Sequence, residues 1–373
     1  MISKKQSIKK LTIKGFKSIR VMEDLALGNL NLLIGANGVG KSNFVSYFKM
    51  LGELVEGRLQ VWSAKQGGAD RILTYGVKET PRLASTVSFG VNKYHFVLEP
   101  TAESKFTFTK EEVFFDESAA ELKAVTFMPG HFESSLKEVV DKADEKEKDQ
   151  FDLLYASISS WKIFHFQDTS DAAGVKRIGS LHDHETLRSD ASNLAAYLYY
   201  LKMDHSEIYA QIRKTVALAI PFFDDFVLKP TVLDSEEEQI RLLWRQKKSD
   251  YALWPSQLSD GSIRFICLTT ALLQPNPPST LIIDEPELGL HPYAIVLLGS
   301  LIRAASARMQ LIISTQSISL LNEFSLNDLI VVEREKGASV FKRLKEDDFK
   351  VWLEEYSVGE LWEKNILGGR PCS

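Results

Sequence analysis

The chain has 373 residues, of which 44% are hydrophobic and 25% charged, and its formal net charge at pH 7 is −5. This composition is typical of a folded protein with two or three subdomains, and it argues against a protein that coats nucleic acid through overall positive charge. Its two cysteines argue against a disulfide framework or a zinc site, and no run approaches the roughly 20 apolar residues of a membrane span. We therefore expect a cytoplasmic protein without a membrane partner.

Elements predicted over the first third of the chain are mostly strands. Near alternation of apolar and polar residues over 8–19 predicts one or two strands. The apolar run 30–34 predicts a buried strand, and helical periodicity follows over 43–55. Several glycines over 57–80 indicate a loop or an ordered insertion. An antiparallel sheet or meander is then expected from short β-rich runs at 85–91, 94–98, 106–109, 113–115 and 125–127.

A helical insertion is expected in the middle of the chain, before strand–helix alternation resumes. The charged stretch 134–161 predicts one helix or a short hairpin, too short for a long coiled coil, and 161–166 returns to strand. This order predicts one large α/β core with a helical insertion. The remaining predicted elements are helices over 189–203, 206–220, 259–273 and 292–307, a strand pair over 226–233 and 239–245, and strands over 280–284 and 310–314.

Residues 35–42 read GANGVGKS, a complete G-x-x-x-x-G-K-S phosphate-binding loop. The loop stands between a predicted strand and a predicted helix, as its mechanism requires. Lys41 would reach the β- and γ-phosphates, and Ser42 would bind Mg²⁺. Backbone N–H groups would point at the phosphates from the loop and the first helical turn, with Asn37, Gly38, Gly40 and Asn43 among the nucleotide-binding residues.

The segment Thr280–Pro286 (TLIIDEP) places two carboxylates after an apolar strand, as in a Walker B motif. Asp284 would hold Mg²⁺ through its water shell, opposite Ser42. Glu285 points elsewhere and would polarise the water that attacks the γ-phosphate.

A third motif, Leu258-Ser259-Asp260-Gly261-Ser262, stands at a predicted helix start. Ser259 and Gly261 can present a hydroxyl, N–H groups and a helix N-terminus to a phosphate. In isolation the same residues form an ordinary helix cap. The sequence between this motif and the strand that begins at Thr280 leaves room for one helix and a turn.

As a set, these motifs resemble an ABC-type ATPase head: phosphate loop, L-S-x-G-x signature, D-E-P after the second strand, and S-T-Q-S at 314–317. The wide separation of loop and signature resembles the SMC, RecF and OLD branch rather than a compact transporter subunit. We expect a stand-alone head without long coiled-coil arms, and the region after Ser317 is too short for a Toprim nuclease domain. Further resemblance to that branch lies at 15–19 (GFKSI), 193–195 (NLA), 287–292 (ELGLHP) and 358–362 (VGELW).

The resemblance implies an α/β fold, with a mixed central sheet, an antiparallel β subdomain and a helical subdomain that carries the signature. It divides the single head into a nucleotide-binding lobe with its β subdomain, over 1–130 and 275–373, and a helical insertion lobe over 131–274.

The resemblance also implies a mechanism in which two heads sandwich two ATP molecules as a homodimer. Ser259 and Gly261 would then touch the γ-phosphate of the nucleotide held by the partner head. Residues 288–291 would correspond to the loop that links the two active sites, although His291 is equally well explained as a turn histidine beside Pro292.

Two positions depart from the family pattern. Gln316 stands where a switch histidine is usual; its amide can hydrogen-bond a phosphate oxygen or the attacking water but cannot take a proton, which suits slow, switch-like hydrolysis. Gln167, after the strand 163–166, is the candidate for the family's glutamine that contacts Mg²⁺ and nucleotide, and its alternative is an exposed polar loop residue.

These inferences predict an ATPase that controls a separate effector protein in prokaryotic antiphage defence or DNA surveillance. The alternative is a RecF-like DNA-binding repair or replication ATPase. Six lysines in the first 17 residues offer a local basic face, although lysines along an exposed strand more often form a solvated edge.

Three further classes are less favoured. The long insertion argues against a transporter subunit, and Asn92-Lys93-Tyr94-His95 lacks the aspartate that a GTPase needs to read guanine. A nuclease metal site at 182–185 (HDHE) is disfavoured because four adjacent side chains cannot all face one ion on a regular element.

Overall fold

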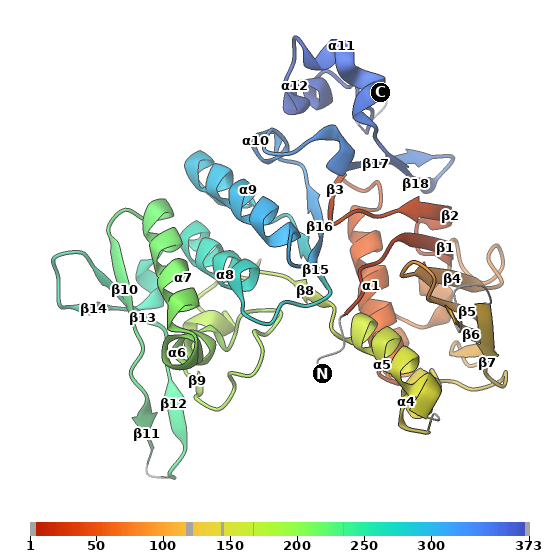
Figure 1. Ribbon diagram of the computed structural model, residues 1–373, viewed down its shortest axis with the longest axis horizontal. Coiled ribbons are helices and arrows are strands. Elements are labelled where there is room, and N and C mark those ends of the chain that lie inside the picture. Colours follow the sequence, from red (N-terminus) through yellow and green to blue (C-terminus); the bar gives the residue numbers. More distant parts are fainter. Residues whose placement is uncertain (1–4, 117–121, 143–144, 167, 234, 370–373) are drawn as a thin grey trace.

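The computed structural model describes residues 5–116, 122–142, 145–166, 168–233 and 235–369. Its centre is a six-stranded sheet in the order β18-β17-β3-β16-β15-β8 (Figure 1). Only β18 runs antiparallel to its neighbour, so the sheet is mixed. These strands are β3 (Leu30–Ile34), β8 (Lys162–Phe164), β15 (Thr280–Asp284), β16 (Gln310–Thr315), β17 (Leu329–Glu335) and β18 (Ala338–Arg343).

Three adjacent inner strands, β3, β16 and β15, are buried almost throughout, as parallel strands covered on both faces must be. Because they run in parallel, their carboxyl ends meet at one edge of the sheet. This edge brings the phosphate loop after Ile34 next to Asp284 and to Gln316.

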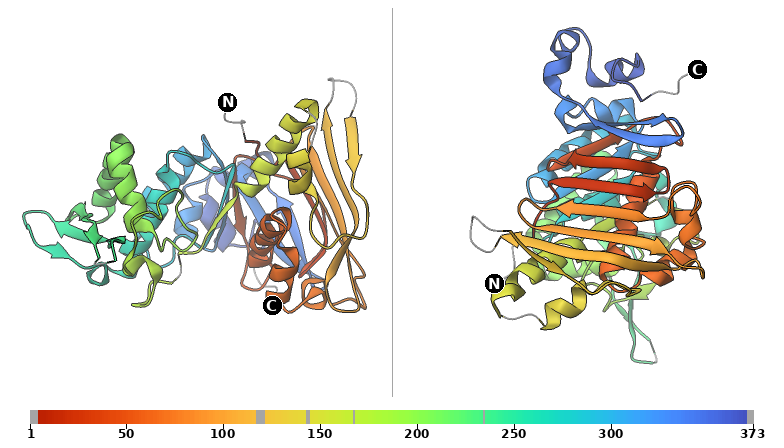
Figure 2. Two further views of the ribbon diagram at one scale, coloured as in Figure 1. Left: turned by 90° about the horizontal axis from the view of Figure 1, so that it is seen from below. Right: turned by 90° about the vertical axis from the view of Figure 1, so that its right-hand side faces the viewer.

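A second six-stranded sheet is antiparallel, in the order β2-β1-β4-β5-β6-β7. Helix α1 (Lys41–Val55) lies between the two sheets (Figure 2). Its aromatic residues Phe44 and Phe48 share one buried cluster with Ile312 of the central sheet and Val87 of the antiparallel sheet. The antiparallel strands are β1 (Lys10–Phe16), β2 (Ile19–Ala26), β4 (Leu83–Ser88), β5 (Lys93–Pro100), β6 (Phe106–Asp116) and β7 (Leu122–Thr126).

Parts of this lobe differ from the prediction. The runs expected as separate strands at 106–109 and 113–115 form the single strand β6, which pairs with β5 across a register shift. Of the two alternatives for 57–80, a loop or an ordered insertion, the structure fits the second, with two short helices, α2 (Leu59–Lys65) and α3 (Ala69–Ile72).

Helices α4 (Leu136–Lys142) and α5 (Glu145–Ser159) form the charged hairpin. We expected this stretch in the helical lobe, but it covers the β lobe. Phe151 joins the cluster around α1, and Tyr155 Oη donates to Glu56 Oε1 at 2.7 Å. Phe151, Leu154 and Ile158 of α5 all belong to this cluster, and their spacing of three and four residues forms an apolar helix face toward the β lobe.

The helical lobe contains α6 (Leu194–Asp204), α7 (Ser206–Ala219) and α8 (Asp260–Leu273), and α9 (Pro292–Ser306) packs beside α8. The strands expected over 226–233 and 239–245 do pair antiparallel, as Phe226 with Trp244 and Thr231 with Gln239 show. The pairing is interrupted around Pro230, which has no N–H, so that its two halves belong to two small sheets. Their strands are β10 (Phe223–Val227), β13 (Leu243–Gln246) and β14 (Ala252–Leu253) in one, and β9 (Gly179–Ser180), β11 (Thr231–Val232) and β12 (Glu238–Ile240) in the other.

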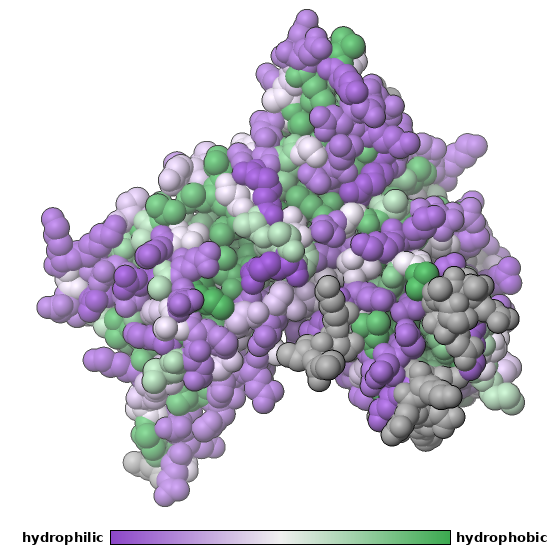
Figure 3. Space-filling view, in the orientation of Figure 1, coloured by the Kyte–Doolittle hydropathy of each residue, from purple (hydrophilic) through white to green (hydrophobic). Residues whose placement is uncertain are grey.

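The chain ends in a small helical projection beyond the central sheet, built from α10 (Ile318–Leu321), α11 (Lys350–Leu353) and α12 (Val358–Glu363) (Figure 1). The face seen in Figure 3 is largely hydrophilic, with hydrophobic residues gathered over α8 and α9. None of the helices in the described ranges is long and apolar enough to span a bilayer.

Candidate nucleotide-binding site

The phosphate loop is held from outside by two serines. A Cβ at Gly40, whose φ is +116°, would clash with Ser339 Oγ, so this position requires glycine. Ser339 Oγ donates to Val39 O at 2.5 Å and lies 2.7 Å from Ser18 Oγ. Asn43 Nδ2 donates to the same Ser18 Oγ at 2.7 Å. Strand β18 and the β1–β2 turn thus fix the second half of the loop.

Lys41, the first residue of α1, is buried beneath the phosphate loop. Its Nζ donates to the carbonyl oxygens of Gly35 at 2.6 Å and Ala36 at 3.0 Å. Burial lowers the pKa of Lys41, and the nearby carboxylates of Glu285 and Asp284 act in the opposite direction. An ammonium in this position can exchange a carbonyl for a phosphate oxygen.

The predicted Mg²⁺ ligands come from α1 and β15. Ser42 is exposed in the first turn of α1. Asp284 ends β15 and accepts a hydrogen bond from Ser314 Oγ on the adjacent strand. A hydroxyl and a carboxylate are hard oxygen donors, so this set fits Mg²⁺ with water completing its shell.

Gln316 connects the phosphate loop to the carboxylate that follows β15. Gln316 Nε2 donates to Glu285 Oε1 and to Asn37 Oδ1, each at 2.7 Å. Glu285 has a left-handed backbone with φ +46°, and its N–H donates to Ser314 O at 2.9 Å. A strained backbone at a glutamate is common at functional sites. The fold thus brings Asn37, Lys41, Asp284, Glu285 and Gln316 into one site.

Glu287 belongs to this site, although the motifs did not single it out. Its Oε1 accepts from Thr315 Oγ1 at 2.6 Å and from the backbone N–H of Gln316 at 3.2 Å. Burial raises the pKa of Glu287. The stretch 287–292 carried the only sequence signal for it, as part of the resemblance to the SMC branch.

The signature residues lie on a different surface. Ser259 caps α8, its Oγ accepting from the Ser262 N–H at 3.1 Å. A Cβ at Gly261 would clash with the carbonyl oxygen of Gly289, so the signature packs directly on the loop that follows β15. Arg264 strengthens this contact by donating to Leu288 O.

The two remaining predicted positions are His291 and Gln167. His291 caps α9, its Nδ1 accepting from the Tyr293 N–H at 3.2 Å, as a turn histidine would. Gln167 lies outside the described residues.

The cluster at 182–185 has ordinary surface partners, including an ion pair between Asp183 and Arg188 at 2.7 Å. Within the described ranges, no group of three or more His, Cys, Asp or Glu is placed to hold a metal ion.

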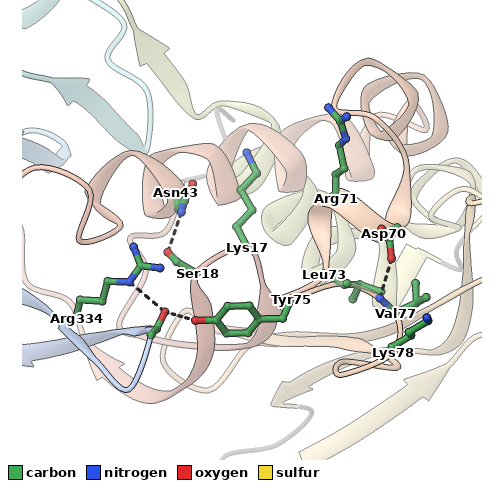
Figure 4. Close-up of a pocket in the computed structure, with 12 residues that line it drawn as sticks. Lys17, Ser18, Asn43, Asp70, Arg71, Leu73, Tyr75, Val77, Lys78 and Arg334 are labelled. Atoms are coloured by element: carbon green, nitrogen blue, oxygen red, sulfur yellow. Dashed lines mark hydrogen bonds between the residues drawn. The ribbon is translucent and has the colours of Figure 1, made fainter.

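A cavity of about 700 Å³ opens beside Asn43 and Ser18 (Figure 4). Lys17, Arg71 and Arg334 are among its lining residues, which gives it a cationic character. Tyr75 forms another part of the wall, and its Oη donates to Gly337 O at 2.6 Å.

The fold and the site together define an ABC-type ATPase head of the SMC/RecF-like branch, which confirms the predicted fold class. More specifically, the chain belongs to the family described as "AAA domain, putative AbiEii toxin, Type IV TA system", whose model matches residues 30–322. Comparison with curated proteins finds no match.

Two solved structures illustrate the fold. An Smc head bound to the C-winged helix domain of ScpA is 13% identical, with 92% of this chain and 99% of that chain covered and a TM-score of 0.59. An Smc head with an extended coiled coil, bound to the C-terminal domain of ScpA derived from Pyrococcus furiosus, is 12% identical, with 94% and 99% covered and a TM-score of 0.55. At these identities the likeness shows the fold alone.

Proposed function

We propose that the chain binds ATP with Mg²⁺, hydrolyses it slowly to ADP and phosphate, and dimerises head to head around the nucleotide. In this state it would regulate a separate effector protein, in prokaryotic antiphage defence or DNA surveillance. The observation that carries the proposal is the Gln316 amide, which joins Glu285 to Asn37 of the phosphate loop. This contact supports the proposal, because it links the proposed base to the loop that would bind the phosphates.

Each residue then has a role. The loop N–H groups and Lys41 bind the phosphates, and Ser42 with Asp284 holds Mg²⁺, which supplies charge neutralisation when bound. Glu285 accepts a proton from the attacking water or orients it. Gln316 restrains the Glu285 carboxylate and cannot itself take a proton.

The cavity of Figure 4 is the proposed site for the ribose and base. In a phosphate loop the lysine reaches the terminal phosphates, so the rest of the nucleotide extends away from it. Asn43 connects the two sites, because it directly follows the phosphate loop in the sequence and also lines the cavity. Lys17 and Arg71 would attract the α-phosphate end.

The surface around the signature supports a homodimer. Ser259 is exposed there, and so are the apolar residues Leu288, Tyr293 and Val296 on the adjoining loop and α9. In a two-fold sandwich each subunit would place this surface against the nucleotide held by its partner, so the same patch would be used twice in the dimer.

The structure gives less support to DNA as a ligand. Lys14 pairs with Glu23 of the neighbouring strand at 2.5 Å, and Lys17 lines the cavity beside the phosphate loop. Lys14 and Lys17 are therefore already engaged within the described chain, which weakens the case for a basic face that includes them. A separate protein partner is the favoured output, and the two Smc heads named above are themselves bound to ScpA domains.

Two variants test the proposal. Lys41→Ala should abolish ATP binding and phosphate release, while Lys65→Ala on the exposed face of α2 should leave both unchanged. Glu285→Gln should bind ATP, hydrolyse it poorly and accumulate as a dimer measured by light scattering. If Lys41→Ala hydrolyses ATP as the wild type does, the nucleotide site is wrong. If Glu285→Gln binds ATP but remains monomeric, the sandwich is wrong.

A further inference from the structure

The segment at the end of the described chain touches the phosphate loop directly. The carbonyl oxygen of Gly369 accepts a hydrogen bond from the Ala36 N–H at 2.8 Å. A Cβ at Gly369 would lie 3.0 Å from Val331 Cγ1 and 3.4 Å from the Gly35 Cα, and φ there is +84°. The approach therefore depends on glycine, for reasons of both space and backbone conformation.

Strand β17 fixes this contact from the other side. Glu333 Oε1 accepts from the Gly369 N–H at 2.7 Å. Strand β17 is also the parallel neighbour of β3, with Val331 paired to Ile34 immediately before the loop. Gly369, Glu333 and the start of the loop thus form one hydrogen-bonded unit.

The other end of the same segment contacts the Gln316 side of the site. The Gly359 N–H, in α12, donates to Asn322 Oδ1 at 2.7 Å. Asn322 ends α10, the helix that Ser317 caps directly after Gln316. Residues 358–369 therefore span from the helix behind Gln316 to the first residues of the phosphate loop.

We infer that residues 358–369 are a positioning element of the nucleotide site. Gly369 holds the start of the loop through Ala36, and α12 holds the segment that carries Gln316. Displacing this element would loosen the loop and weaken the grip on the phosphates. The inference rests on the proposed nucleotide binding, but it does not require the dimer or any effector.

The central test compares Gly369→Ala with Gly57→Ala. Gly57 also has a positive φ, of +70°, but a Cβ there would meet open space, so this variant controls for backbone strain alone. Gly369→Ala should raise the ATP dissociation constant and KM about fivefold, as expected for one lost hydrogen bond, with kcat changed less than about twofold. Gly57→Ala should leave all three constants at their wild-type values. Binding is measured with a fluorescent ATP analogue.

A second pair of variants tests the same contact without altering a glycine. Glu333→Ala removes the acceptor for Gly369 and should raise KM in the same direction. Glu333→Gln keeps an oxygen acceptor and should restore most of the affinity. The effects of Gly369→Ala and Glu333→Ala should be less than additive in the double variant, because both break one unit.

The outcomes separate this inference from the proposed function. If the wild type fails to bind ATP, the proposed function falls. If the wild type binds ATP, Lys41→Ala does not, and Gly369→Ala and Glu333→Ala both bind as the wild type, only the positioning role is overturned. If Gly369→Ala does not fold, the comparison of Glu333→Ala with Glu333→Gln decides.

Discussion

Two helix N-termini in this chain are assigned to phosphate, and they are built differently. The first four N–H groups of a helix have no partner within the helix. At α1 the cap residue is Gly40, and no side chain occupies those groups. At α8 the Ser259 side chain already accepts from the Ser262 N–H. The first terminus is open to an anion, whereas the second is already capped.

Charge increases this difference. Lys41 opens α1, and the first turn of that helix has no acidic residue. Asp260 stands in the first turn of α8, where it uses the favourable field of the helix dipole that a phosphate would otherwise use. On the proposed function, we therefore expect the phosphate loop to bind a nucleotide alone and the signature only to add to a phosphate that a partner head already holds.

The largest effect is expected when one helix terminus is inactivated in one chain and the other terminus in a second chain. Lys41→Ala and Ser259→Arg should each be inactive in hydrolysis when alone. Mixed in equal amounts, they should recover up to about one quarter of wild-type activity, because half of random pairs are mixed and each mixed pair has one intact site. Phosphate release is measured against the mixing ratio.

Recovery in the mixture is a result that a site within one chain cannot give. Ser256→Arg is the matched control, since Ser256 is also exposed and lies just before the signature. If Ser259→Arg alone hydrolyses ATP at the wild-type rate, the signature takes no part in hydrolysis.

A smaller effect is expected when the hydrogen bond between Gln316 and Glu285 is removed. Gln316→Ala frees the Glu285 carboxylate from its 2.7 Å hydrogen bond. We expect kcat to fall about tenfold, which is less than the roughly hundredfold or greater loss expected when a general base itself is removed, with KM nearly unchanged. Gln316→Glu is the matched variant, because it keeps the length but places a second negative charge beside Glu285. A tenfold change in KM instead of kcat would assign Gln316 to binding.

The sequence located the residues whose chemistry is local. Glycines before Lys41, and carboxylates directly after an apolar strand, identify themselves within a few positions. The parallel order of β3, β15 and β16 then brings them to one edge. Such motifs are predictable because function requires particular residue types at fixed spacing.

The residues that support the site were not predictable in this way. Ser339 holds Val39 from 300 positions away, and Gly369 holds Ala36 from the far end of the chain. A serine in a strand or a glycine after a helix has many ordinary explanations, and only the folded arrangement selects one. Glu287 was missed as a site residue for the same reason, since its burial depends on β16.

Asp260 offers a way to reduce the difference between the two termini. Asp260→Asn removes the negative charge from the start of α8 while keeping the side-chain shape. We expect ATP-dependent dimerisation of the Glu285→Gln protein to tighten about threefold, in line with charge effects at helix ends. Dimer affinity is measured by light scattering at several protein concentrations and at two salt concentrations. A weaker dimer would mean that Asp260 contacts the partner directly.

The smallest expected effect concerns the buried carboxylate behind Gln316. Burial raises the pKa of Glu287 in the folded protein above its value in the unfolded chain. Its contribution to stability is therefore complete below the unfolded pKa and is lost as the pH rises through the folded pKa. Glu287→Gln keeps an oxygen acceptor for Thr315 and carries no charge. The variant should thus gain stability relative to the wild type as the pH rises from the unfolded pKa through the folded pKa of Glu287.

Thermal unfolding of both proteins without nucleotide, at several pH values, measures this gain. Glu323→Gln is a suitable control, because Glu323 is a partly exposed carboxylate that pairs with Arg303 at 3.0 Å. A gap between wild type and Glu287→Gln that stays constant with pH would show that Glu287 does not titrate differently in the folded state. A stability difference that widens as predicted would show that the charged form of Glu287 destabilises the folded protein. Glu287 would then act by positioning Thr315 and Gln316 at the end of β16, and not by stabilising the fold.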